Sequence, residues 1–182
     1  MFLILIFSLA FASSFAQIPN FGNRNLTPME NFNKSAFAGQ WYIVTRTPNI
    51  FEAGQNCPVF THSLNEQTGS FNSVLSTKSA ITKEYRLQTA TNEAIEDHPS
   101  VFNSYYDYLL PMGQFAILST DYKNYAVAAL AYPKLSSSYL QIIWVYSRTP
   151  VLAHEYYQIA SECLAANKIP AHALKPAKQS DC

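Results

Sequence analysis

The feature that most restricts the fold is a series of eight short runs rich in Val, Ile, Tyr, Phe and Thr. Clusters of Gly, Pro, Asn and Ser separate the runs, a pattern typical of all-β barrels and sandwiches. Because every connector is short, we expect successive strands to pair antiparallel. Eight strands wound up and down can close into a barrel without a free edge. The runs span approximately 40–47, 58–65, 70–78, 81–90, 99–109, 113–120, 124–132 and 138–148.

The spacing of the apolar residues changes after the eighth run. Apolar side chains then recur at steps of four, three and four residues: Leu152, Tyr156, Ile159 and Cys163. This spacing predicts a helix over roughly 150–166, whose apolar stripe packs against the outside of the barrel. Thr149 suits the N-cap of this helix, and Pro150 suits its first position.

The N-terminal segment, residues 1–16, has the pattern of a secretory signal peptide. An apolar run from Phe2 to Phe7 is followed by small residues and by a plausible cleavage site at Ser14-Phe15-Ala16. The run is too short for a membrane span, which needs about 20 apolar residues. We therefore expect a secreted, extracellular protein whose single domain covers residues 17–182.

Charge and composition narrow the classes of partner. The chain has 12 Lys and Arg against 12 Asp and Glu, without a basic block, so we do not expect it to bind nucleic acid. Aromatic residues make up 14% of the chain and many lie in the strand-like runs. This placement predicts a core or cavity lined by aromatic rings.

The three cysteines allow three pairings: Cys57 with Cys163, Cys57 with Cys182, or Cys163 with Cys182. Because Cys163 falls on the apolar stripe of the predicted helix, we favour it as the free thiol. Two sequons precede the first strand, and Asn25 and Asn33 are therefore candidate glycosylation sites. Pro28, directly after the first sequon, makes Asn25 the poorer acceptor.

The chain lacks the residue patterns of common enzymes. Its four histidines are far apart in sequence, and neither a zinc motif, a phosphate-binding glycine loop nor a nucleophile elbow is present. We therefore expect no metal site, no catalytic residue and no required cofactor. His62, on the second run, is the histidine that could face a cavity, where we expect a hydrogen-bonded lining residue rather than a base.

Three separated stretches together resemble the lipocalin family: Gly39-Gln40-Trp41, Thr120 to Val127, and Trp144 to Arg148. The tail from Asn167 to Cys182 and the position of Cys57 are most similar to the group of apolipoprotein D, Lazarillo and arthropod bilin-binding proteins. The resemblance implies an eight-stranded antiparallel up-and-down β-barrel with a C-terminal α-helix outside. It also implies the disulfide between Cys57 and Cys182. A second disulfide usual in that group has lost both partners here.

The resemblance also implies which end of the barrel is closed. In the family, the tryptophan forms the floor of the barrel and the arginine stacks across it as a cation over an aromatic face. The residues with this structural role here are Gly39, Trp41, Asp121, Tyr122 and Arg148. The loops after the first, third, fifth and seventh strands then surround the open end, where we expect Ile50, Phe51, Leu110 and Met112 to contact ligand or membrane, or to fold over as a lid.

Strand alternation assigns side chains to the cavity. If Arg148 points inward, every second residue before it on the same strand does so too. Apolar residues between charged ones place Tyr85 and Leu87 inward on the fourth strand. The predicted ligand-binding residues are Ile43, Phe51, Phe60, Tyr85, Leu87, Phe102, Tyr106, Phe115, Ile117, Ala128, Ile142, Trp144 and Tyr146.

The resemblance implies a carrier that transports or sequesters a small hydrophobic ligand. Biliverdin, fatty acids, sterols and retinoid-like compounds are the implied ligands, and the open-end loops are candidates for contact with a receptor or a membrane. Two alternatives remain: a lipocalin-type isomerase or peroxide-reducing enzyme that uses a cavity thiol, and an interaction protein that acts through its loop surface.

Overall fold

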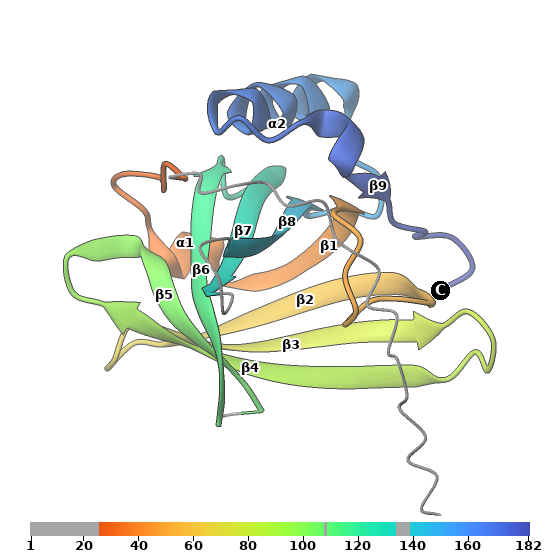
Figure 1. The fold of residues 1–182 in the computed structure, drawn as a ribbon, viewed down its shortest axis with the longest axis horizontal. Helices are drawn as coiled ribbons and strands as arrows, with labels where there is room; N and C mark the ends of the chain where they lie inside the picture. Colours follow the sequence, from red (N-terminus) through yellow and green to blue (C-terminus); the bar gives the residue numbers. More distant parts are fainter. Residues whose placement is uncertain (1–25, 108, 134–138) are drawn as a thin grey trace, which may run out of the picture.

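The computed structural model describes residues 26–107, 109–133 and 139–182. The predicted signal peptide over residues 1–16 and the sequon at Asn25 lie outside these residues. Figure 1 shows a strongly curved sheet with a long helix on its outer side. The expected all-β barrel with an external C-terminal helix is confirmed.

Eight long strands form the barrel wall. Each strand pairs antiparallel with the next along the chain, and β1 also pairs with β8, which closes the ring. The predicted runs match these strands, although β4 begins four residues later than the predicted 81–90. The strands are β1 (Gly39–Arg46), β2 (Gln55–Asn65), β3 (Ser70–Ser79), β4 (Tyr85–Ile95), β5 (His98–Tyr106), β6 (Leu110–Thr120), β7 (Tyr125–Pro133) and β8 (Tyr139–Ser147).

Three short elements lie outside the predicted pattern, because each is too short to show a period. They are the helix α1 (Lys34–Phe37), the 3-10 helix η1 (Ala171–Ala173) and the strand β9 (Lys175–Pro176), which pairs with β1. The exposed Asn33 caps α1, with its Oδ1 accepting a hydrogen bond from the Ala36 N–H at 3.0 Å. Glycosylation of Asn33 remains a prediction.

The helix α2 (His154–Ala166) begins later than predicted. Ala153 is its N-cap residue and makes no side-chain capping bond. Thr149, the expected N-cap, donates its hydroxyl to the Val151 carbonyl at 2.7 Å and so stabilises a turn ahead of the helix. The predicted N-cap at Thr149 and helical position of Pro150 are therefore wrong.

The buried stripe of α2 also differs from the prediction. Ala160 and Leu164 are its buried residues, while 41% of Ile159 is exposed. The ring of Tyr156 stacks on Tyr125 of β7, 6.1 Å away. The stripe therefore runs from Tyr156 in steps of four through an alanine, whose small side chain allows close approach to the sheet.

Strand alternation divides the buried side chains into two clusters. Trp144 and Tyr146 of β8 face the barrel interior, whereas Ile143 and Val145 face α2 on the outside. In Figure 1, α2 lies outside the wall near β7 and β8. The outer cluster lies against the helix, and the inner cluster supplies most of the apolar lining of the cavity.

The C-terminal tail is tied to β1 and β2. Cys57 and Cys182 form the disulfide that the resemblance implied, and Cys163 is a free, half-buried thiol. Gln179 bridges the two strands, since its side-chain amide donates to the carbonyls of Ile43 and Pro58, each at 2.8 Å. In the described part of the chain, neither helix is long and apolar enough to cross a membrane.

Candidate functional site

The closed end of the barrel is built around Trp41 and Arg148. Trp41 is fully buried, and the Arg148 guanidinium carbon lies 3.6 Å from the centroid of its ring. Arg148 also donates hydrogen bonds to the carbonyls of Gln40 at 2.8 Å and Tyr122 at 3.0 Å. A cation over an aromatic face contributes up to about 2 kcal/mol where water is excluded. The geometry matches the floor that the resemblance implied.

The helix α1 completes this floor. Arg148 donates to its last carbonyls, including that of Phe37 at 3.2 Å, and the Trp41 indole N–H donates to the same carbonyl at 2.8 Å. The Phe37 ring stacks on Trp41, with centroids 5.3 Å apart. Gly39 links helix and strand at φ +102°, where a Cβ would lie 3.3 Å from Arg148 Nη1. The close approach of arginine therefore favours glycine here.

Asp121 organises the turn between β6 and β7 at the same end. Its Oδ1 accepts hydrogen bonds from the backbone N–H groups of Lys123 at 3.1 Å, Asn124 at 2.8 Å and Tyr125 at 3.1 Å. Burial raises the pKa of the Asp121 carboxyl, but a hydrogen bond from Asn124 Nδ2 to Oδ2 at 2.6 Å, together with these backbone bonds, outweighs burial and lowers that pKa overall. Tyr122, at φ +67°, adopts the left-handed conformation that this turn requires.

A cavity of about 70 Å³ lies inside the barrel, between the floor and the loops of the open end. Pockets for small molecules usually measure about 300–1,000 Å³, so the site has room for part of such a ligand. A larger ligand requires movement of the aromatic side chains over the cavity. The largest lining side chains are Phe51, Phe60, Tyr106, Phe115 and Trp144.

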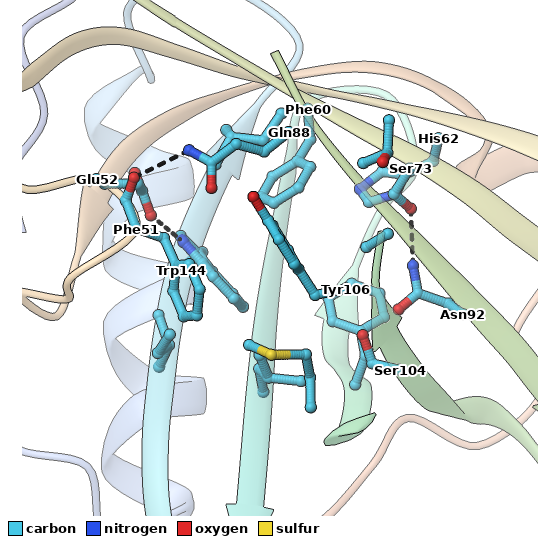
Figure 2. Close-up of a pocket in the computed structure, with 17 residues that line it drawn as sticks. Phe51, Glu52, Phe60, His62, Ser73, Gln88, Asn92, Ser104, Tyr106 and Trp144 are labelled. Atoms are coloured by element: carbon cyan, nitrogen blue, oxygen red, sulfur yellow. Dashed lines mark hydrogen bonds between the residues drawn. The ribbon is translucent and has the colours of Figure 1, made fainter. Parts of the chain in front are cut away.

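The loop between β1 and β2 covers part of the cavity and is held by a buried carboxylate. Glu52 is 1% exposed, accepts hydrogen bonds from Trp144 Nε1 at 2.8 Å and Asn49 Nδ2 at 3.0 Å, and pairs with Arg46 Nε at 2.9 Å. Burial raises the pKa of Glu52, although the charge of Arg46 lowers it in part. These contacts hold Phe51 over the cavity, next to Tyr106. Figure 2 shows Phe51, Glu52 and Trp144 on one side of the pocket.

A second polar group lies across the cavity, where Figure 2 shows His62, Ser73 and Asn92 close together. Ser73 Oγ lies 2.7 Å from His62 Nδ1 and 2.7 Å from Asn92 Nδ2. His62 is 2% exposed, and burial together with the charge of Arg148 lowers its pKa to about 3. At neutral pH its ring is therefore uncharged.

The structure places the predicted ligand-binding residues in three positions. Six line the cavity: Phe51, Phe60, Tyr106, Phe115, Ile142 and Trp144. Five are buried in the inner cluster but do not line the cavity: Ile43, Phe102, Ile117, Ala128 and Tyr146. Tyr85 and Leu87 are 59% and 66% exposed, so their predicted inward orientation is wrong. Whether the inward residues bind ligand remains a prediction.

Strand pairing explains the error on β4. Side chains of directly paired residues lie on the same face of a sheet. Gln88 pairs with the inward Leu75 of β3, and Ala90 pairs with the inward Tyr106 of β5. Leu87 must therefore face outward. Alternation within β4 alone could not reveal this, because its inward residues are polar or small.

The same reasoning missed much of the polar lining. Glu52, Ser73, Gln88 and Asn92 all line the cavity although none was predicted to do so. An apolar pattern does not detect them. The register with neighbouring strands would detect Ser73, Gln88 and Asn92, whereas Glu52 lies in the loop between β1 and β2 and has no register. His62, expected to be a hydrogen-bonded lining residue, has that position.

The open-end residues are divided between the cavity and the surface. Phe51 and Met112 line the cavity, whereas Ile50 and Leu110 are 64% and 61% exposed. Within the described ranges, no group of three or more His, Cys, Asp or Glu side chains could hold a metal ion.

Comparisons with known proteins agree with this geometry. No family model matches the sequence. Mouse (Mus musculus) apolipoprotein D is 25% identical over 153 residues, which cover 84% of this chain and 80% of that protein. Lobster apocrustacyanin A1 has a TM-score of 0.73 at 18% identity, over 91% of this chain and 94% of that chain. Insecticyanin from the tobacco hornworm Manduca sexta has a TM-score of 0.70 at 21% identity, over 86% of both chains.

Sequence and structure both show similarity to known proteins. The sequence similarity and the structural similarity each extend over most of both chains. Together with the Trp41–Arg148 floor, they bear out the resemblance to the lipocalin family that rests on the three motifs.

Proposed function

We propose that this protein is a secreted carrier that binds a small hydrophobic molecule inside its barrel. The observation that carries the proposal is the mainly apolar, aromatic-lined cavity between a sealed floor and a loop-covered open end. Transfer of apolar surface from water into such a site stabilises a complex by about 25 cal/mol per Å². Fatty acids, sterols, retinoid-like compounds and biliverdin are the ligand classes suggested by the family.

The proposal is a binding protein rather than an enzyme. The free thiol that a peroxide-reducing or isomerase mechanism would need is Cys163, which lies on α2 outside the barrel. Burial raises the pKa of this thiol to about 11, although a hydrogen bond from Asn167 lowers it in part. The thiolate that would react is therefore scarce at neutral pH.

A second proposal concerns the open end as a contact surface. Ile50, Ile81, Leu109 and Leu110 lie on the loops and strand ends around it and are between 61% and 89% exposed. Exposed apolar side chains gathered at one end of a molecule favour contact with a membrane or a receptor.

Extraction and titration test the carrier function. The protein is purified from its own source, its organic extract is analysed by mass spectrometry, and its absorption spectrum is recorded. Fatty acids, sterols, retinol and biliverdin are then titrated while Trp144 fluorescence is followed. We expect a stoichiometric bound molecule or saturable binding of one class. A protein that yields no bound molecule and binds none of these compounds would contradict the proposal.

A further inference from the structure

The first residues of β4, Tyr85 to Gln88, have a neighbouring strand on one side only. On that side β3 pairs with them, beginning with Lys78 opposite Tyr85. On the other side, pairing with β5 begins at Ala90, opposite Tyr106, which is the last residue of β5. Figure 1 shows this end of β4 continuing beyond β5 toward the hairpin with β3. In the described part of the chain, the barrel therefore has a short free edge at its open end.

Two hydrogen bonds show which backbone groups point to this free edge. The Glu84 carbonyl accepts a hydrogen bond from the last N–H of β3 at 2.8 Å, so it points to β3. The Thr89 carbonyl accepts from the Asp107 N–H at 3.0 Å, so it points away from β3. Successive residues of a paired strand direct their backbone N–H and C=O groups to alternate sides. Tyr85 and Leu87 therefore direct these groups to the free edge.

The side chains next to this edge are exposed and alternate in character. Tyr85 and Leu87 are apolar and lie on the outer face, whereas Glu84 and Arg86 are charged and lie on the opposite face. All four are exposed to solvent. Unpaired backbone groups beside exposed apolar side chains form a template on which another strand can add.

The sequence around Tyr85 is complementary to itself in charge. An antiparallel pair of two copies, related by a two-fold axis at Tyr85, places Glu84 of each copy opposite Arg86 of the other. These two residues form a non-hydrogen-bonded pair, in which side chains approach most closely, and opposite charges at such positions attract. On the outer face, Tyr85 lies opposite its equivalent and diagonal to Leu87 of the other copy. The pairing therefore covers apolar surface and forms two ion pairs.

The adjacent registers are less favourable. A two-fold axis at Arg86 would place two arginines opposite each other, where like charges repel. An axis at Leu87 would bring Tyr85 of the second copy opposite Thr89, whose carbonyl already accepts from Asp107. The axis at Tyr85 avoids both conflicts.

We propose that this protein forms a two-fold dimer in which the first residues of β4 pair antiparallel with those of a second copy of the chain. The contact is short, so the dimer is weak and its population depends on protein concentration. None of the pairing residues, from Glu84 to Leu87, lines the cavity. The proposal is therefore independent of the carrier function.

Sedimentation velocity over a range of protein concentrations tests the dimer through its charges. We expect the unaltered protein to dimerise, and Glu84→Arg, which places like charges opposite each other, to raise the dissociation constant at least about tenfold. The double variant Glu84→Arg/Arg86→Glu exchanges the two charges and should restore the dissociation constant to within about threefold of the original. Circular dichroism checks that each variant is folded.

Glu93→Arg is the matched control. Glu93 is also exposed on β4, but there β5 pairs with the strand, so the same change of charge should leave dimerisation unaltered. An unaltered protein that stays monomeric up to about 1 mM would overturn the proposal. A double variant that dimerises no better than Glu84→Arg alone would also overturn it.

Disulfide trapping tests the register. Two proteins are prepared in a Cys163→Ser background, which removes the free thiol, and carry Glu84→Cys or Arg86→Cys. In the proposed register these two positions face each other at a Cα separation that suits a disulfide. The mixture should therefore form a covalent heterodimer under oxidation. Arg86→Cys that links to itself instead, or a mixture that does not link, would overturn the proposed pairing.

Discussion

Arg148 stabilises the closed end of the barrel through two kinds of interaction at one position. Its guanidinium stacks on Trp41, and its N–H groups donate to carbonyls of α1, of β1 and of the turn before β7. These carbonyls would otherwise be short of donors, because α1 has only four residues. At the scale of single residues, this end of the molecule is a structural site.

Trp41→Ala should destabilise the protein without direct effect on the ligand. Trp41 is fully buried but does not line the cavity, so the change should cost about 3–5 kcal/mol of unfolding free energy. Urea denaturation measures this loss, and Trp144 fluorescence reports ligand affinity. Unchanged stability together with abolished binding would show that the floor and the open end are assigned to the wrong ends of the barrel.

His62 should make stability depend on pH between 7 and 5. Its pKa is about 3 in the folded protein and 6.5 in the unfolded chain, so the unfolded chain takes up the proton first and stability falls as pH falls. The loss between pH 7 and pH 5 should be about 2 kcal/mol.

Urea denaturation of the protein and of His62→Phe at both pH values isolates this contribution. The variant keeps an aromatic ring and should lose less stability on acidification. The exposed His98, His154 and His172 are present in both proteins, so their effects cancel. Equal losses in the two proteins would show that His62 is protonated in the native state.

At the scale of elements, the loop between β1 and β2 is bonded to the cavity wall through several side chains. Asn49 Oδ1 accepts from the backbone N–H groups of Phe51 and Glu52, both at 3.1 Å, and Glu52 bonds to Trp144. Gln88 also donates to the Phe51 carbonyl at 3.0 Å. The loop is therefore a candidate for the element that opens to admit ligand.

Asn49→Ala should loosen this loop. The substitution removes the acceptor for two backbone N–H groups, so amide hydrogen exchange at Phe51 and Glu52 should become about tenfold faster. The backbone amides of strands β6 and β7 should keep their protection against hydrogen exchange. Asn72→Ala, on the outer face of β3, is the control. Equal exchange rates in the two variants would show that Asn49 does not hold the loop in place.

The helix α2 gives a matched test of its buried stripe. Leu164→Ala should cost about 2–5 kcal/mol, because the side chain is buried against the sheet. Ile159→Ala should cost less than about 1 kcal/mol, because the side chain is half exposed. Urea denaturation compares the two variants, and a larger loss for Ile159→Ala would support the stripe expected from sequence.

For the whole molecule, the disulfide joins β2 to the end of the chain across 125 residues. The tail between them adds β9 to the sheet and bonds to the strand carbonyls through Gln179. The barrel itself closes through β1 and β8 and does not include the tail. Stability and ligand binding should therefore respond differently when the tail is released.

The double variant Cys57→Ser/Cys182→Ser should lower stability by about 2–5 kcal/mol while ligand affinity changes by less than about threefold. Differential scanning calorimetry and fluorescence titration measure the two effects. Cys163→Ser is the control and should leave both nearly unchanged, since that thiol is unpaired. Loss of ligand binding in the double variant would show that the C-terminal tail forms part of the ligand site.

Strand number, strand order and the sealed end could be predicted because each depends on local pattern or on a few distinctive residues. Runs of β-branched and aromatic residues separated by turn residues mark the strands. Trp41 and Arg148 mark the floor through their place in the motifs. The face of a strand was predictable where its inward residues are apolar, as with Trp144 and Tyr146, because burial of apolar surface then selects the face.

The sequence by itself predicted the strands and the external helix from hydrophobic spacing and short connectors, and its resemblance to the lipocalin family implied the closed end of the barrel. Tertiary structure alone decided which face of β4 lines the cavity, where α2 begins, and how His62, Ser73 and Asn92 meet. The physical reason is that polar lining residues are selected by hydrogen-bond partners on other strands. Such partners depend on register between strands, which a single strand's alternation does not contain.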